Sequence, residues 1–273
     1  MHNQAPPAML LKDKTAVIYG AAGAVGSAIA RAFAREGAQV HLTARGNSFK
    51  RLHDMADNFA TANSSVEIAE VDALDEKAVE SHADAVVKSA GKIDISFNAI
   101  GIPQPGIQGR PIPELPVENF LLPITTYLRS HFLTARAAVR RMAPQKSGVI
   151  LLHTPEPARA GAPLIGGMGP MWAALEALTR NLSAELGAQG IRAVCLRSTG
   201  LPETPTIATV FGLHAQAIGI PREQFQAMME SMSFHRRSTT LQELSDAAVF
   251  AASDRGGGLF GTVLNLTAGK SAD

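Results

Sequence analysis

A glycine-rich turn joins two apolar runs near the start of the chain and constrains the fold more than any other segment. Gly20, Gly23 and Gly26 recur at every third position between the strand-like run 15–20 and a helix-like run that begins at Val25. Such a turn bends tightly, brings the backbone close to a diphosphate and lets the next helix pack against the strand. The N–H groups at the helix N-terminus then attract the anion. The segment therefore predicts a strand–turn–helix unit that binds a dinucleotide.

The rest of the chain alternates between strand-like and helix-like segments. Short apolar runs rich in β-branched residues predict strands, and longer amphipathic runs predict helices. The predicted strands are 15–20, 38–43, 66–71, 93–97, 149–154, 191–197 and 262–266. The predicted helices are 25–36, 49–59, 75–90, 117–142, 172–187 and 241–252. This order predicts an α/β fold: a single Rossmann-like domain over 11–269, with a doubly wound parallel sheet of about seven strands and helices on both faces.

Two segments fall outside this alternation. Residues 1–10 have no basic-then-apolar signal pattern and are expected to form a flexible N-terminal tail. Residues 200–240 form a long insertion after the sixth predicted strand, where a substrate loop or lid would lie. The alternative is that its apolar side chains pack against the body of the protein or a partner subunit. These side chains are Phe211, Phe225, Met228, Met229, Met232 and Phe234.

The composition narrows the range of partners and compartments. The chain has 273 residues, of which 46% are hydrophobic and 18% charged, as in globular proteins. A net charge of +1 gives no reason to expect nucleic acid or an anionic membrane as a partner, and no apolar stretch approaches the roughly 20 residues of a membrane span. The single cysteine, Cys195, is expected to be a buried strand thiol rather than a nucleophile, and it fits a reducing cytoplasm. A small molecule is therefore the expected ligand.

The segment after the second predicted strand indicates which dinucleotide binds. An acidic residue there would bond the ribose hydroxyls and repel a 2′-phosphate. The chain instead has Arg45, which can pair with a phosphate and favours NADP(H); a solvated surface arginine is the alternative. Asp72 follows the third predicted strand and either meets the adenine edge or caps a turn. Further expected cofactor contacts come from Val25, Ala73, Asn98 and Gly101.

The chain resembles the short-chain dehydrogenase/reductase family from residue 11 to residue 269. The resemblance rests on the glycine turn, Asp72, and the segments 98–101, 173–180, 200–204, 250–255 and 261–266. It implies an NAD(P)-dependent oxidoreductase that forms a homodimer or homotetramer. It also implies that Thr204 contacts the nicotinamide side of the cofactor.

The resemblance also locates the positions of the family's catalytic set. That set consists of a tyrosine acid, a lysine one helical turn later, a serine that orients the carbonyl and an asparagine on an earlier helix. Alignment through 173–180 places Trp172 at the lysine, Met168 at the tyrosine and Pro155 at the serine. Alignment through 132–136 places Tyr127 at the asparagine. We therefore expect the usual proton donor to be absent.

A shift in register does not restore the missing pair. The chain has two tyrosines, Tyr19 and Tyr127, and no lysine between Lys146 and Lys270. The helix that begins near residue 172 therefore holds no Tyr-x-x-x-Lys pair in any register. Loss of a positioned acid typically costs roughly 10²–10⁴ in rate.

Three side chains are candidates for replacing the acid. Tyr127 is the phenol nearest the expected site, and His153 shares a strand face with Pro155. Glu156 has a proline on each side that fixes its backbone. The alternatives are interface packing for Tyr127, a core histidine for His153 and an exposed ion-pairing carboxylate for Glu156.

These observations predict an atypical NADP(H)-dependent oxidoreductase. Its substrate would be an apolar or pre-activated small molecule, such as a carbonyl, imine or enone, that reacts without the usual Tyr/Lys acid. Two alternatives remain: a catalytically inactive NADP(H)-binding regulatory or structural protein, and a nonredox isomerase or lyase that uses the same cavity.

Overall fold

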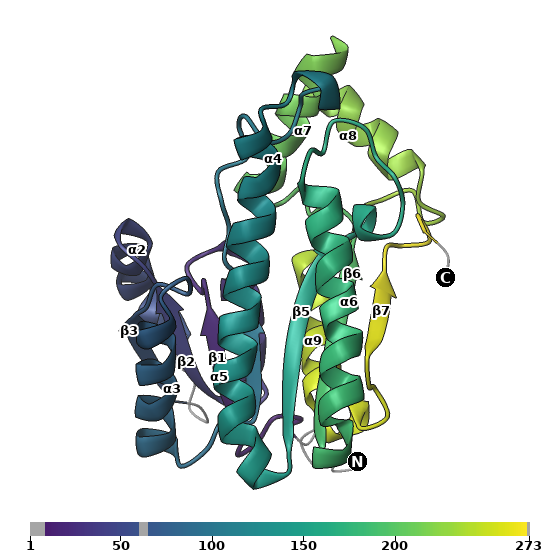
Figure 1. Cartoon of the computed structure of the whole chain (residues 1–273). Helices are drawn as coiled ribbons and strands as arrows, with labels where there is room; N and C mark the ends of the chain where they lie inside the picture. The colour runs from purple at the N-terminus through teal and green to yellow at the C-terminus, as the bar shows by residue number, and fades with distance from the viewer. Residues whose placement is uncertain (1–8, 60–64, 272–273) are drawn as a thin grey trace.

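Within residues 9–59 and 65–271, which the computed structural model describes, seven parallel strands form the centre of the molecule (Figure 1). They are β1 (Thr15–Tyr19), β2 (Gln39–Ala44), β3 (Val66–Glu70), β4 (Ile95–Asn98), β5 (Gly148–Pro155), β6 (Ile191–Ser198) and β7 (Thr262–Leu266). Their order in the sheet is β3-β2-β1-β4-β5-β6-β7. The strand order therefore reverses between β1 and β4, and in open parallel sheets ligands bind beside such a reversal. Most of the predicted tail lies outside the described residues.

Helices cover both faces of this sheet. The α-helices of the described residues are α1 (Ala24–Arg35), α2 (Asn47–Met55), α3 (Glu76–Ala90), α4 (Val117–Pro123), α5 (Arg129–Gln145), α6 (Met168–Leu186), α7 (Pro205–Ile218), α8 (Arg222–Ser231) and α9 (Leu241–Ala252). One face packs against α1 and α9, and the other packs against α3, α5 and α6. Every residue of β1 and of β6 is buried, as expected for strands covered on both sides. The predicted doubly wound fold is confirmed.

Two helices differ from their predicted bounds near the site. The predicted helix 117–142 is divided by a π-helical segment, Ile124–Leu128, between α4 and α5. Pro123 precedes this segment and has no N–H to donate, which favours a local change in the hydrogen-bond ladder. Helix α6 begins at Met168, about one turn earlier than predicted. Its first turn therefore carries a position that the alignment assigned to the catalytic set.

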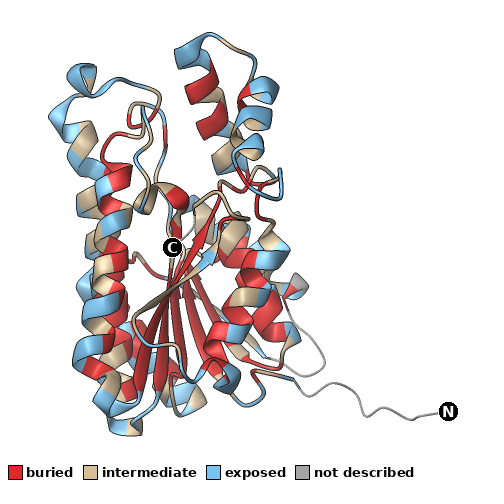
Figure 2. Ribbon diagram, turned by 90° about the vertical axis from the view of Figure 1, so that its right-hand side faces the viewer, coloured by how far each residue is buried: buried red, intermediate tan, exposed pale blue. Residues whose placement is uncertain are grey.

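The insertion 200–240 folds into α7 and α8, which lie beyond the carboxyl ends of the strands (Figure 1). Phe211 and Phe225 are buried between these helices, with ring centroids 5.4 Å apart in an edge-to-face contact. Met228, Met232 and Phe234 are exposed. Figure 2 shows buried residues on the inner side of the two helices and exposed ones outside. The insertion therefore has its own small core.

Cys195 lies on β6 with none of its surface exposed. Burial raises the pKa of its thiol to about 12, so the sulfur stays protonated at neutral pH. The prediction of a buried strand thiol is confirmed. Among the described residues, no helix combines the length and the apolar character needed to cross a bilayer.

Candidate active site

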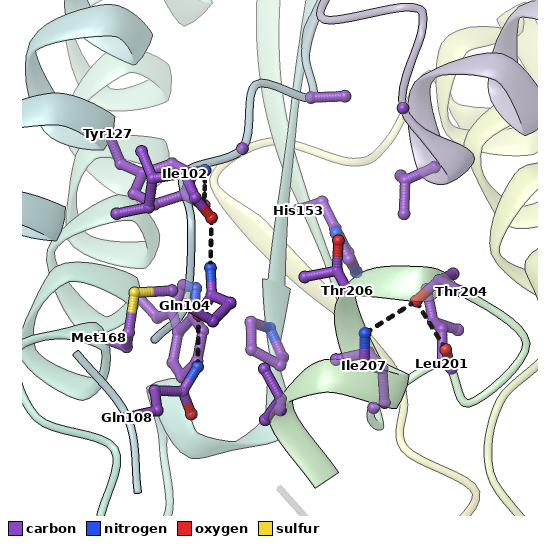
Figure 3. Close-up of a pocket in the computed structure, with 18 of the residues that line it drawn as sticks. Ile102, Gln104, Gln108, Tyr127, His153, Met168, Leu201, Thr204, Thr206 and Ile207 are labelled. Atoms are coloured by element: carbon purple, nitrogen blue, oxygen red, sulfur yellow. Dashed lines mark hydrogen bonds between the residues drawn. The ribbon is translucent and has the colours of Figure 1, made fainter. Parts of the chain in front are cut away.

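A cavity of about 700 Å³ lies at the carboxyl ends of the strands, under α7 and α8. Figure 3 shows Tyr127 and Met168 on one side of it, Thr204 and Thr206 on the other, and His153 between them. The cavity gathers nearly all of the predicted cofactor residues: Gly20, Gly23, Val25, Arg45, Asp72, Ala73, Asn98, Gly101 and Thr204. Gly26 lies behind the turn and does not line the cavity.

The glycine turn leaves one end of the cavity open to an anion. A Cβ on Gly20 would lie 2.7 Å from the backbone of Ala99, and a Cβ on Gly26 would lie 2.6 Å from the Gly20 carbonyl oxygen. Gly23 lines the cavity and would meet only backbone oxygens, the nearest at 3.4 Å. Gly23 is also the N-cap of α1, and it has no side chain that could cap the N–H groups of that helix. The N–H groups there remain available, so this end fits a dinucleotide diphosphate.

Two arginines lie at the β2–α2 side of the cavity. Arg45 pairs with Asp72 at 2.6 Å (Nη1–Oδ2), and Asp72 also accepts a hydrogen bond from the backbone of Leu74. Asp72 thus bonds the turn that follows β3, and Arg45, whose side chain is 61% exposed, forms an ion pair with it at the surface. Ser48 and Arg51 of α2 line the cavity as well. These two residues were not predicted, although their three-residue spacing on one helix face could have indicated them.

Asn98 and Thr204 hold the loops that border the cavity. The Asn98 amide donates to the hydroxyls of Ser130 and Thr134 and accepts from the backbone N–H of Ile100. The Thr204 hydroxyl caps α7 by accepting from the Ile207 N–H at 3.3 Å. Their contacts with a cofactor stay predictions, but both side chains are rigidly placed where such contacts would form.

His153 and Tyr127 both line the cavity. Burial shifts the pKa of each side chain from its ordinary value. Burial and, to a smaller extent, the nearby His131 lower the pKa of His153 to about 4. The Ser198 hydroxyl donates to a carbonyl, so His153 Nε2, 2.9 Å from that hydroxyl, must carry the proton and donate it there. Burial raises the pKa of Tyr127, whose phenolic oxygen accepts from the N–H of Ile102. His153 is therefore neutral at pH 7, with its proton engaged.

Glu156 is neither at an exposed rim nor free. It follows β5 in a short 3₁₀ turn, is 8% exposed, and lies 2.9 Å (Oε2–Nζ) from Lys270. Lys270 comes from the segment after β7 and also lines the cavity. The alternative interpretation, an exposed ion-pairing carboxylate, is wrong because the ion pair is buried. The sequence predicts no role for Lys270, because nothing in the local pattern shows that the segment after β7 returns to β5.

A second unpredicted group is a buried polar chain next to Tyr127. The Gln104 side-chain oxygen Oε1 accepts a hydrogen bond from the Gln108 side-chain amide at 2.7 Å. The side-chain oxygen Oε1 of Gln108 lies 3.1 Å from Nε2 of His214. All three are buried and line the cavity. They connect the loop after β4 to α7, so the insertion is joined to the body by polar as well as apolar contacts.

Known proteins resemble this chain along nearly its whole length. A family model described as enoyl-(acyl carrier protein) reductase matches residues 20–271. An uncharacterized oxidoreductase of Bacillus subtilis (strain 168) is 31% identical over 245 residues, covering 89% of this chain and 86% of the relative. The chain belongs to the short-chain dehydrogenase/reductase family.

A further sequence relative matches this chain in length, and two solved structures match it in fold. Short chain aldehyde dehydrogenase 1 of Euphorbia lathyris is 29% identical, covering 98% of this chain and 92% of the relative. An NAD⁺-bound xylitol dehydrogenase has a TM-score of 0.87 at 23% identity, covering 95% of this chain and 99% of that one. A gluconate 5-dehydrogenase from Burkholderia cenocepacia J2315, solved with NADP and tartrate, has a TM-score of 0.83 at 22% identity, covering 96% and 97%. At these identities the structural likeness shows the fold alone.

The four positions that the alignment assigned to the catalytic set of this short-chain dehydrogenase/reductase all line the cavity. They are Tyr127, Pro155, Met168 and Trp172. Met168 is 3% exposed, and Trp172 is half-buried. A thioether, an indole and a proline ring form an apolar wall that has no titratable proton.

Proposed function

We propose that this protein is an atypical NADP(H)-dependent oxidoreductase that acts on an apolar or pre-activated carbonyl, imine or enone. The observation that carries the proposal is a single cavity that joins an open glycine cradle to the apolar wall of Met168 and Trp172. The cradle supports dinucleotide binding, and relatives of this fold were solved with NAD⁺ and with NADP. The wall supports a reaction in which the usual Tyr/Lys acid takes no part.

The arginines support NADP(H) rather than NAD(H). Arg45 lines the cavity beside β2, and Ser48 and Arg51 of α2 line it next to Arg45. A 2′-phosphate would offer both guanidinium groups a stronger partner than an exposed carboxylate does. No acidic residue occupies the end of β2, where it would repel this phosphate.

The remaining lining supports an apolar substrate. The space under the insertion is bordered by aliphatic, aromatic and thioether side chains: Ile207, Val210, Phe211, Phe225, Met228 and Met229. When bound, the nicotinamide supplies the hydride. The residues of the chain bind and orient the substrate and exclude water from the reacting carbon.

A homodimer or homotetramer remains part of the proposal. Leu121 and Leu122 of α4 and Phe132 of α5 expose large apolar side chains. A second copy that covered these side chains would remove them from water. Light scattering at several protein concentrations measures the assembly directly, and a monomer throughout would contradict this part.

The test of function combines binding with turnover. The purified protein is titrated with NADPH and with NADH, and loss of the reduced-nicotinamide absorbance is followed with panels of ketones, enones and iminium ions. We expect tighter binding of NADPH by about tenfold or more, and oxidation of NADPH by at least one panel. NADPH binding without oxidation would favour a regulatory protein. Substrate conversion without any absorbance change would favour a nonredox enzyme.

A further inference from the structure

A lysine and a glutamate meet inside the cavity although they lie far apart in the sequence. The Lys270 ammonium is 2.9 Å from a carboxylate oxygen of Glu156, and the two side chains are 8% and 11% exposed. Both residues line the cavity, and Glu156 directly follows Pro155, which lines the apolar wall. A cation thus lies in the same cavity as a wall that has no titratable proton of its own.

The backbone around Lys270 is held in a fixed turn. Asn265 donates through its amide to the Ser271 carbonyl at 2.6 Å, and the Thr267 hydroxyl accepts from the Ser271 N–H at 3.2 Å. The Lys270 N–H itself donates to the carbonyl of Thr267. These contacts order the C-terminal segment, so the lysine side chain enters the cavity from a defined position.

The ammonium has donors left for a ligand. An ammonium group carries three N–H bonds, and among the described residues Glu156 is the sole side-chain partner of Lys270. Burying a charge pair costs several kcal/mol, so a pair retained at a cavity wall is poorly explained by stability alone. Two N–H bonds remain for an oxygen atom of a molecule in the cavity.

The other proton donors of the cavity are less suited to this role. His153 is neutral at pH 7 and donates its proton to Ser198. Burial raises the pKa of Tyr127, which makes its phenol a weaker acid. Arg45 and Arg51 lie on the β2–α2 side, with the predicted phosphate contacts.

We propose that Lys270, held by Glu156, binds the carbonyl oxygen of the substrate and protonates it. The proposal rests on the proposed function and concerns its carbonyl substrates, including enones that react at the carbonyl. As the carbonyl carbon accepts a hydride from the reduced nicotinamide, the C=O π electrons move to oxygen. Oxygen takes a proton from Lys270 Nζ as that N–H bond breaks. The amine then regains a proton from solvent, so one solvent proton is consumed per carbonyl reduced.

The first test compares two substrates of matched shape, a ketone and a preformed iminium ion. Lys270→Met should lower kcat for the ketone by roughly 10²–10³, because it removes the donor that faces the developing negative charge. The iminium ion carries no such oxygen, so its rate should change by less than about threefold. Lys270→Arg should recover part of the ketone rate because it retains a cationic donor. Equal losses for both substrates would mean a structural role and would overturn the proposal.

A second test requires no turnover. With NADP⁺ at saturation, fluorescence of Trp172, the single tryptophan and a cavity residue, reports binding of a lactam, whose carbonyl the cofactor does not reduce. Lys270→Met should weaken lactam binding about tenfold, the value of one charge-assisted hydrogen bond, and leave a cycloalkane of equal ring size unaffected. Unchanged lactam affinity in the variant would also overturn the proposal.

The controls separate this inference from the proposed function. Lys88→Met alters an exposed lysine of α3. It should leave the ketone rate, the iminium rate and the lactam affinity unchanged. NADPH affinity should be the same in wild type and in Lys270→Met. Failure of the wild type to oxidise NADPH in every panel would refute the proposed function, whereas the lactam titration would still decide the role of Lys270. Glu156→Gln is a second variant that disrupts the ion pair. Thermal melting of each variant identifies any loss of folding.

Discussion

Under the proposed function, single side chains around the β2–α2 turn decide which dinucleotide the cavity favours. Arg45 and Asp72 form an ion pair that is partly exposed on both sides, and such pairs contribute about 0–1 kcal/mol. A phosphate can therefore displace Asp72 from Arg45 at little cost in free energy. Arg45 could be predicted because the turn after a second strand has a known role. Lys270 could not, because its partner Glu156 is brought near only by the complete fold.

Removal of Arg45 should change dinucleotide preference more than dinucleotide binding. Arg45→Ala should weaken NADPH binding by roughly tenfold to a hundredfold, the range for hydrogen bonds to charged groups, and leave NADH binding within about twofold. Titration of both dinucleotides measures the ratio. Arg35→Ala, on the exposed surface of α1, is the matched control. Equal weakening of NADPH and NADH would show that Arg45 does not contact the 2′-phosphate.

At the scale of elements, the β1–α1 unit agrees closely with the prediction, whereas α7 and α8 of the insertion were not predicted. Glycine spacing, strand and helix are all local signals, so residues 15–36 could be predicted to within about two residues. For residues 200–240, the sequence indicates an apolar insertion but does not indicate which of its side chains contact each other. Phe211 packs against Phe225 across two helices, and His214 bonds Gln108 far back in the chain. Such contacts depend on tertiary structure and leave no periodic signal.

The second and third glycines of the turn, Gly23 and Gly26, should respond differently to a methyl group. Gly23→Ala meets only backbone oxygens at 3.4 Å and beyond, so folding should persist while the methyl group obstructs the anion site and weakens NADPH binding by about tenfold or more. Gly26→Ala places its Cβ 2.6 Å from a backbone oxygen, so it should also lower the melting temperature. Calorimetry of both variants measures the melting temperature, and titration measures the NADPH affinity, so the two effects can be separated. A stable Gly23→Ala protein with wild-type affinity would contradict a diphosphate site at this turn.

At the scale of the whole molecule, the packing that builds the sheet also buries histidines that cannot easily ionise. Burial lowers the pKa of His82 and of His131 to about 4, from an ordinary value of 6.5. The unfolded chain takes up these protons as pH falls below 6.5, while the native protein does not. Stability is therefore fully present above pH 6.5 and declines between pH 6.5 and about 4.

This acid sensitivity should be traceable to single histidines. Each of these histidines contributes up to about 3 kcal/mol of the loss, from the size of its pKa shift. His82→Leu removes one titrating ring whose Nδ1 has no hydrogen-bond partner in the described structure. Urea unfolding at several pH values should show a shallower decline for this variant than for wild type. His53→Gln, at an exposed site on α2, should leave the slope unchanged, and an unchanged slope in His82→Leu would contradict the account.

The central claim is that this cavity carries out redox chemistry although Met168 and Trp172 form the wall where a Tyr/Lys acid is expected. Isotope transfer measures this most directly. The protein is incubated with NADPH deuterated at the transferable position and with the carbonyl compound that supports the fastest NADPH oxidation, and the product is analysed by mass spectrometry. We predict a product that carries one deuterium on the former carbonyl carbon. A product without deuterium, or no product while NADPH is bound, would contradict the claim.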